Sequence, residues 1–141
     1  MTLAAERQDA RQTDAVVAGL IHYLETGDVP DELFAADVIS DVSLVCWRLR
    51  GVTAAEAIAV RTSGHPFPGH VRVERLDRTE RGFVLQFEER WVHEGQEWYC
   101  REMIRADVQG GHLVDMAVYC TGDWDQARQR AHADATSLPR P

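Results

Sequence analysis

The second half of the chain alternates apolar and polar residues over four long segments, and this pattern limits its fold more than any other feature. Because successive side chains of a β-strand point to opposite faces, period-two alternation predicts strands with one buried face. The connections between them read DRTER, HEGQE and QGG, each of hairpin length. We therefore predict an antiparallel meander, with strands at His70–Asp77, Gly82–His93, Glu97–Val108 and His112–Cys120.

The first half of the chain reads differently, because its apolar residues recur at helical spacing. Helices are expected at Thr13–Thr26, at Pro30–Ala36 and at Ala54–Thr62, the last capped by Thr53 with Glu56 in a capping box. One long strand, Asp37–Arg50, separates the second and third helices, and DWDQARQRAHAD predicts a short C-terminal helix. The expected organisation is a flexible tail, one domain, and a helix end with a frayed tail, at residues 1–12, 13–125 and 126–141.

Composition narrows the class of protein. The 141 residues are 45% hydrophobic and 27% charged, which is ordinary for one globular domain. The net charge of −8 and the lack of a basic cluster argue against nucleic-acid binding. All 15 basic residues are arginine, so a Schiff-base lysine mechanism is excluded. The sequence has no membrane-length apolar run and no secretory signal, and its three cysteines lack metal spacing, so we expect a cytoplasmic protein.

Helices gathered at one end of an antiparallel meander define an α+β domain, and long strands curl around them to leave a cavity. Three segments carry a family resemblance: LETGD (Leu24–Asp28), LFAADV (Leu33–Val38) and the run from Arg101 to Asp125. Here the chain resembles the nuclear-transport-factor-2-like superfamily, which includes SnoaL-like polyketide cyclases, ketosteroid isomerase and limonene epoxide hydrolase. The resemblance implies a cone-shaped curved sheet wrapped around the N-terminal helices, in the order α-α-β-α-β-β-β-β plus a short C-terminal helix.

No catalytic set of these relatives transfers completely. Where a ketosteroid isomerase would carry its shuttling Asp, the matching position holds Val42, with Asp41 pointing to the other face. Leu20 stands where the oxyanion-hole Tyr belongs, and the second acid falls near Ile104, with Glu102 the nearest acid on that face. The Asp–Arg–Asp pattern of the epoxide hydrolase is also incomplete. The resemblance therefore predicts the fold more specifically than the reaction.

Two carboxylates stand out on otherwise apolar strand faces. Glu102 shares a face with Trp98, Cys100 and Ile104, and Glu89 shares one with Phe87 and Trp91. A carboxylate among apolar neighbours is desolvated, which raises its pKa and suits a general acid or base. Joined by the HEGQE turn, the two would lie close together and split their pKa values. The alternative is that each pairs with an arginine of an adjacent strand.

A pocket wall is the expected role of several large side chains. Aromatic faces give a flat ligand a large contact area, so we assign substrate binding to Trp47, Trp91, Trp98, Tyr23 and His70. Core packing is the alternative for the tryptophans. His65 and His70 flank the HPFPGH loop, and neither has a second ligand at helical or hairpin spacing, so no metal site is predicted. A histidine of this loop at the cavity mouth could instead gate the cavity or carry protons.

The leading hypothesis is a small-molecule enzyme of SnoaL-like type that uses no cofactor. Glu102 would be the principal acid or base and Glu89 its assistant, in cyclisation, isomerisation, dehydration or epoxide opening of an apolar oxygenated substrate. The alternative is a non-catalytic ligand-binding or interaction domain, whose glutamates are neutralised by Arg90, Arg101 or Arg105 and whose cavity the tryptophans fill. In either case we expect a homodimer through the outer sheet face, which carries Val84, Val92, Tyr99, Met103 and Val118.

Overall fold

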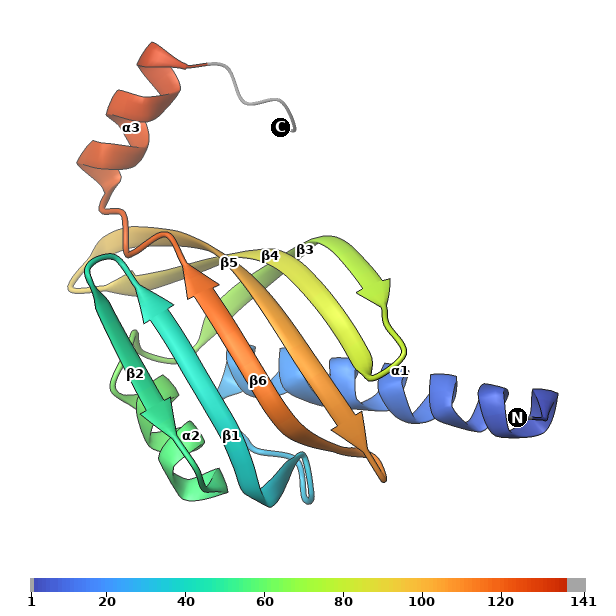
Figure 1. The fold of residues 1–141 in the computed structure, drawn as a ribbon. Helices are drawn as coiled ribbons and strands as arrows, with labels where there is room; N and C mark the ends of the chain where they lie inside the picture. The colour runs from blue at the N-terminus through green and yellow to red at the C-terminus, as the bar shows by residue number, and fades with distance from the viewer. Residues whose placement is uncertain (1, 137–141) are drawn as a thin grey trace.

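A computed structural model describes residues 2–136. Three helices and six strands follow one another along the chain (Figure 1). Their bounds are α1 Leu3–Thr26, β1 Phe34–Leu44, β2 Trp47–Gly51, α2 Ala54–Thr62, β3 Gly69–Arg78, β4 Gly82–His93, β5 Gln96–Gln109, β6 His112–Cys120 and α3 Gln126–Ala135. The four strands of the predicted meander and the helices at Ala54–Thr62 and near the C-terminus are confirmed. The predicted frayed tail, residues 137–141, lies outside the described residues.

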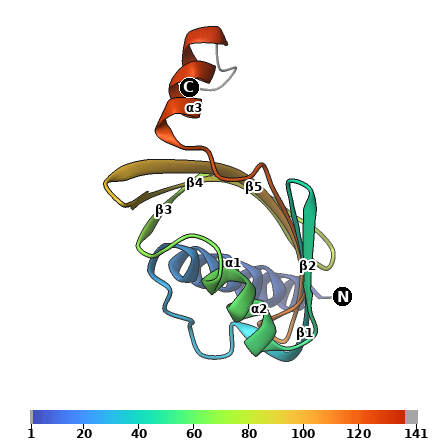
Figure 2. The ribbon, with the colours of Figure 1, turned by 90° about the vertical axis from the view of Figure 1, so that its left-hand side faces the viewer.

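The strands form one curved sheet in the order β2-β1-β6-β5-β4-β3. It is mixed, because β1 pairs with β6 in parallel while all other neighbours are antiparallel. The sheet curls around α1 and α2, which lie on its concave side (Figures 1 and 2). Helix α3 projects from the opposite side, where Gln129 donates to the carbonyl of Glu97 on β5. The predicted α+β fold, a curved sheet wrapped around N-terminal helices, is therefore confirmed, with one parallel strand pair in place of a wholly antiparallel sheet.

The predicted helix at Pro30–Ala36 is wrong. Glu32 adopts a positive φ of 64°, which no right-handed helix tolerates, and β1 begins at Phe34. The backbone N–H of Leu113 donates to the carbonyl of Leu33 at 2.8 Å, so the segment extends the pairing of β1 with β6. The Pro and acidic residues that suggested a helix start form a turn here instead.

The single strand predicted at Asp37–Arg50 is in fact a hairpin. Val45 and Cys46 form a two-residue turn between the paired residues Leu44 and Trp47, and Cys46 has a φ of 64°. Two-residue hairpins usually place Gly, Asn or Asp at such a position, so the sequence carries no turn signal here. The hairpin gives the sheet its short edge strand, β2.

The first helix is longer than predicted. Thr2 caps it by accepting a hydrogen bond from the backbone N–H of Ala5, and the helix then runs without a break from Leu3 to Thr26. Most of the predicted flexible tail at residues 1–12 is therefore helical. Gly27 ends the helix in the left-handed region, with a φ of 82°. Among residues 2–136, no helix is both long and apolar enough to cross a membrane.

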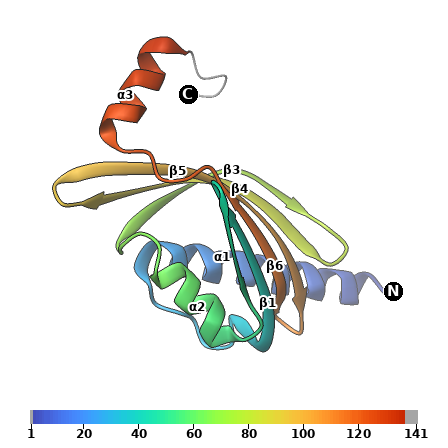
Figure 3. The same cartoon turned by 60° about the vertical axis from the view of Figure 1, so that its left-hand side comes forward.

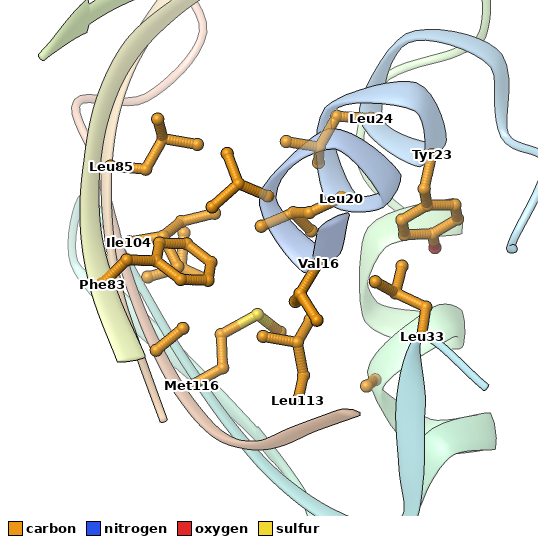
Figure 4. Close-up of a cluster of buried hydrophobic side chains, with 14 of the residues drawn as sticks. Val16, Leu20, Tyr23, Leu24, Leu33, Phe83, Leu85, Ile104, Leu113 and Met116 are labelled. Atoms are coloured by element: carbon orange, nitrogen blue, oxygen red, sulfur yellow. The ribbon is translucent and has the colours of Figure 1, made fainter. Parts of the chain in front are cut away.

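The core lies between α1 and the concave sheet face (Figure 4). Val16, Leu20 and Leu24 from α1 meet Phe83 and Leu85 of β4, and each is at least 95% buried. These helix residues recur at spacings of four, which places them on one face. The core fills only part of the concave side, and the remainder holds the cavity described below.

Helix α2 forms one wall of that cavity, so its capping matters for the site. Thr53 Oγ1 accepts from the N–H of Glu56, and Glu56 Oε2 accepts from the N–H of Val52. We expect Thr53→Ala to lower the free energy of unfolding by about 1 kcal/mol, because an N-terminal N–H loses its partner. Thr62→Ala, at the exposed C-terminal end of the same helix, should change it by less than about 0.5 kcal/mol. Urea denaturation measures both; equal effects would contradict the capping role.

The outer sheet face carries exposed apolar side chains, including Val92, Met103 and Tyr119. Val118, which the sequence analysis also placed there, is buried on the concave side instead. Exposed apolar area on a sheet favours association. The homodimer stays a prediction: sedimentation at micromolar concentration should give a dimer, and Met103→Glu should shift it toward monomer. A monomer at that concentration would contradict it.

Candidate functional site

A cavity of about 220 Å³ lies between the helices and the concave face of the sheet. Figure 3 shows α1 and α2 facing the sheet from this side. Most of the lining is apolar and comes from α1, β1, β2, α2, β5 and β6: Leu20, Tyr23, Leu24, Phe34, Val42, Leu44, Leu49, Ala57, Val60, Ile104, Met116 and Val118. The polar lining residues include Glu102, Arg61, His65, Cys120 and Asp123. An apolar cavity with a few convergent polar groups is the usual form of a small-molecule site.

Glu102 is the carboxyl group inside the cavity, whereas Asp123 lies at its opening. It lies on β5 on the same face as Cys100 and Ile104, both of which are buried, as the alternation predicted. Glu102 itself is partly exposed. Because it points to the concave side and lines the cavity, that exposed surface faces the cavity and not bulk solvent. A ligand in the cavity would therefore meet this carboxyl directly.

Glu89 lies beside Glu102 but is buried more completely. It pairs with Cys100 across the β4–β5 ladder, and Phe87 pairs with Glu102, so the two glutamates are diagonal neighbours on one face. Glu89 is 1% exposed. Its Oε2 accepts a hydrogen bond from His65 Nε2 at 2.8 Å, and its Oε1 lies 3.5 Å from the guanidinium of Arg61. The prediction that the two carboxylates come together is confirmed.

The environments of the two glutamates push their pKa values apart. Burial alone would raise the pKa of Glu89, but hydrogen bonds from His65 and Glu102 and the charge of Arg61 outweigh it, so the pKa lies below its usual value. Burial raises the pKa of Glu102 well above its usual value, and the nearby charge of Glu89 adds to the effect. These opposite shifts favour a protonated Glu102 beside an ionised Glu89.

Because the pKa of Glu102 is raised in the folded state, its contribution to the free energy of unfolding should fall as the pH rises. A carboxyl whose pKa is higher in the folded state contributes stability at low pH, and this is lost as the pH rises through the folded value. Glu102→Gln has no titrating group at this position. As the pH rises above about 4.5, the wild type should therefore lose stability relative to Glu102→Gln. Urea denaturation of both proteins between pH 4 and 9 measures the difference. A constant difference across this range would contradict a raised pKa.

Arg61 at the end of α2 and His65 in the loop that follows lower the pKa of Glu89. Arg61, in the last turn of α2, donates to the carbonyls of His65 and Leu24 at 3.0 and 2.9 Å and lies over the ring of Phe67. The His65 ring stacks on Trp91 with centroids 3.7 Å apart. Because an ionised carboxylate can only accept, Nε2 carries the hydrogen in the His65–Glu89 bond. His65 Nδ1 is buried and has no partner among the described residues.

His65, Glu89, Cys100 and Glu102 bring four donor atoms within 4.8 Å of one another, a spacing that a metal ion could bridge. None of these partners lies near His65 in the sequence, because Glu89 is on β4 and Cys100 and Glu102 are on β5. Two features favour a shared proton over a cation here. Arg61 already supplies a positive charge 3.5 Å from Glu89, and a histidine that ligates a metal usually has a partner on its other nitrogen.

Three residues of the predicted aromatic wall, all tryptophans, do not line this cavity. Trp47 is 70% exposed at the start of β2, and the cavity reaches only Leu49, two residues farther along the same face. Trp91 and Trp98 line a second recess of about 390 Å³ beside the turn of the β4–β5 hairpin. His70 lines that recess as well and is exposed. Alternation correctly predicts which face a residue joins, but not where the cavity ends along the strand.

Tyr23 is the one predicted ligand-contacting residue that lines the cavity. It is 98% buried in α1, and its neighbour His22, which the sequence left as an alternative, is exposed. Sequence reasoning missed Arg61, Cys120 and Asp123. The two residues Ser63 and Gly64 are exposed on one side of the cavity and Asp123 on another, so these residues mark its opening. In the sequence, Asp123 was only the first residue of the segment predicted to form the C-terminal helix.

No protein-family model matches the chain, and no curated protein matches it in sequence. Solved structures do resemble it. A nuclear-transport-factor-2-like protein from Anabaena variabilis has a TM-score of 0.69 and 16% identity, over 87% of this chain and 96% of that one. An epoxide hydrolase of the LEH-like type from M. tuberculosis has a TM-score of 0.63 and 12% identity, over 78% and 83%. IdmH of Streptomyces antibioticus, provisionally assigned as a polyketide cyclase, has a TM-score of 0.62 and 15% identity, over 87% and 99%.

These similarities define the class of protein by its architecture. The chain has the nuclear-transport-factor-2-like fold, as the sequence resemblance predicted. At 12–16% identity, the three structures share the backbone plan but carry no statement about the reaction. The chemistry of this chain has to be argued from its own cavity.

Proposed function

We propose that the protein is an enzyme that performs acid–base chemistry on a small apolar oxygenated molecule bound in the cavity. Glu102 is the general acid that meets the ligand, and Glu89 is the ionised neighbour that keeps the proton on Glu102. The observation that carries this proposal is one carboxyl group partly exposed inside an apolar cavity, beside a second carboxylate held by His65 and Arg61.

The arrangement suits proton transfer for a physical reason. A neutral carboxylic acid in an apolar site can donate to a carbonyl, hydroxyl or epoxide oxygen of the ligand. After the transfer, the charge on Glu102 would lie beside ionised Glu89, which favours recovery of the proton. The site thus supports cyclisation, isomerisation, dehydration or epoxide opening, and it does so with the protein's own groups.

Two features weigh against the alternative of a filled, non-catalytic domain. Glu89 is paired with Arg61, but Glu102 has no arginine partner among the described residues, because Arg101 pairs with Glu74 and Arg105 with Asp107 and Asp115. Arg90, the third arginine that was expected to neutralise the glutamates, lies over the ring of Tyr99. The tryptophans, moreover, do not fill the cavity, because Trp47 is exposed and Trp91 and Trp98 line a different recess.

The size of the cavity limits the ligand. About 220 Å³ is smaller than the roughly 300–1,000 Å³ of sites for drug-sized ligands. We therefore propose a monocyclic or bicyclic ligand with one oxygen near Glu102 and apolar carbon elsewhere. A tetracyclic steroid would require the opening to widen.

A thermal-shift screen followed by turnover assays tests the proposal. The screen should contain small cyclic ketones, enols and epoxides, and a bound ligand at 100 times its Kd should add roughly 2.7 kcal/mol to the free energy of unfolding. Each hit is then incubated with the protein and analysed for products. Hits that are converted support the enzyme, whereas hits that bind but never change would favour a binding protein of the same fold.

A further inference from the structure

We propose that Cys120 is a nucleophile in the same cavity, which reacts with an α,β-unsaturated carbonyl ligand while Glu102 supplies the proton. This rests on the proposed function, because it uses the same acid and the same cavity. It goes further by assigning a covalent site and an electrophilic class of ligand. The product is a thioether between the ligand and the protein.

The position of Cys120 carries the inference. Cys120 is the last residue of β6 and pairs directly with Glu102 across the β5–β6 ladder. Side chains of directly paired residues lie on one face with their Cβ atoms about 4.5–5.5 Å apart. Cys120 is partly exposed and lines the cavity, so a bound ligand meets the thiol and the carboxyl side by side.

The surroundings of Cys120 favour its thiolate. The N–H of Gly122 points at its sulfur, with 3.4 Å between the two atoms. Cys100 lies beneath it, with its sulfur within 4.8 Å. The pKa of Cys120 lies below its usual value, because the neighbouring Cys100 thiol and the Gly122 N–H outweigh burial and the charges of Asp123 and Glu89. Cys100 itself is fully buried and faces Glu89 and Glu102, so it supports Cys120 and does not reach the ligand.

Three residues of the cavity lining carry a buried polar atom that has no hydrogen-bond partner within the described part of the chain. These atoms are His65 Nδ1, Ser40 Oγ and Arg61 Nε. Buried polar groups are normally paired, so unpaired ones need an explanation. A carbonyl-bearing ligand, or water brought with it, would supply such a partner.

The addition balances without any further reagent. The sulfur of Cys120 donates an electron pair to the β-carbon of the unsaturated ligand, and a C–S bond forms. The electrons of the C=C bond move toward the carbonyl, and the proton of Glu102 is delivered to the resulting enolate. Water at the cavity opening takes the proton of the Cys120 thiol before the attack, and water returns one proton to the Glu102 carboxylate afterwards. The net change is addition of S–H across C=C, with no oxidation or reduction.

Mass spectrometry of the full chain tests this with 2-cyclohexen-1-one. The exposed thiol of Cys46 serves as an internal reference. We expect the enone to label Cys120, and an excess of the saturated competitor cyclohexanone to slow labelling of Cys120 but not of Cys46. Glu102→Gln should slow enone addition at Cys120 by about tenfold or more, since general acid catalysis is lost. Labelling of Cys120 by iodoacetamide, a displacement that needs no proton donor, should change by less than about twofold.

Labelling confined to Cys46, or an unchanged enone rate in Glu102→Gln, would overturn the inference. The outcome is separable from that of the proposed function. Adduct formation without turnover of any hit would support the nucleophile and contradict the enzyme. Turnover of a hit with Cys120 left unlabelled would support the enzyme and contradict the nucleophile.

Discussion

Replacing Glu102 by glutamine is expected to reduce turnover of any converted ligand by about 10²–10⁴-fold, the usual contribution of a positioned general acid. Glutamine has nearly the shape of the neutral carboxylic acid and fits the same place beside Cys100, but it cannot give up a proton. Binding should therefore change little while the chemical step fails. Comparing kcat and Kd of wild type and Glu102→Gln for the same ligand measures both effects.

Glu88→Gln provides the matched control, because Glu88 is the same residue type on a neighbouring strand. Its carboxylate faces the opposite side of the sheet, where it accepts from Arg72 and Tyr99. Glu88→Gln should keep kcat within about twofold, because Glu88 does not line the cavity. Full turnover by Glu102→Gln, or an equal loss in both variants, would remove Glu102 from the chemistry.

The second large effect concerns stability. Glu89→Ala should lower the free energy of unfolding by roughly 3–5 kcal/mol, because removing one partner leaves the other charge buried and unpaired. Arg61, whose side chain is 14% exposed, would keep its charge without a carboxylate, and His65 would lose its acceptor. Urea denaturation at neutral pH, followed by the fluorescence of the tryptophans, measures the loss.

Two comparisons isolate the buried charge from simple truncation. Glu89→Gln keeps the shape and an acceptor for His65, so it should cost less, about 1–3 kcal/mol. Glu88→Ala removes a carboxylate whose arginine, Arg72, is half exposed, and its loss should stay near 1 kcal/mol. If Glu89→Ala costs no more than Glu88→Ala, the ion pair with Arg61 does not hold Glu89 in its ionised form.

The site was predictable where strand periodicity decides the outcome. Alternation alone places Glu89 and Glu102 on the buried face, and the short HEGQE turn makes their strands neighbours. It does not give the register that makes them diagonal neighbours, nor the loop that brings in His65. Arg61 reaches Glu89 from the last turn of α2, and His65 reaches it from the Gly- and Pro-rich segment that follows, in both cases through tertiary packing. Their roles therefore could not be inferred from spacing.

The errors in the fold have similarly local causes. A positive φ at Glu32 and another at Cys46 make turns at residues that rarely adopt that conformation, so neither turn carries a signal. Trp47 was misplaced because alternation along a strand says nothing about where the facing helices end. The parallel pairing of β1 with β6 is a long-range contact, and local patterns of the sequence cannot predict it.

The most direct test of the account is a ¹³C NMR titration of the glutamate side-chain carboxyl carbons, assigned with Glu102→Gln and Glu89→Gln. We expect the pKa of Glu102 to lie well above the usual value of 4.5 and the pKa of Glu89 to lie below it. If the pKa of Glu102 is at or below 4.5, Glu102 is not a neutral acid at neutral pH. The proposed acid–base chemistry and the assisted addition at Cys120 would then both lose their proton donor.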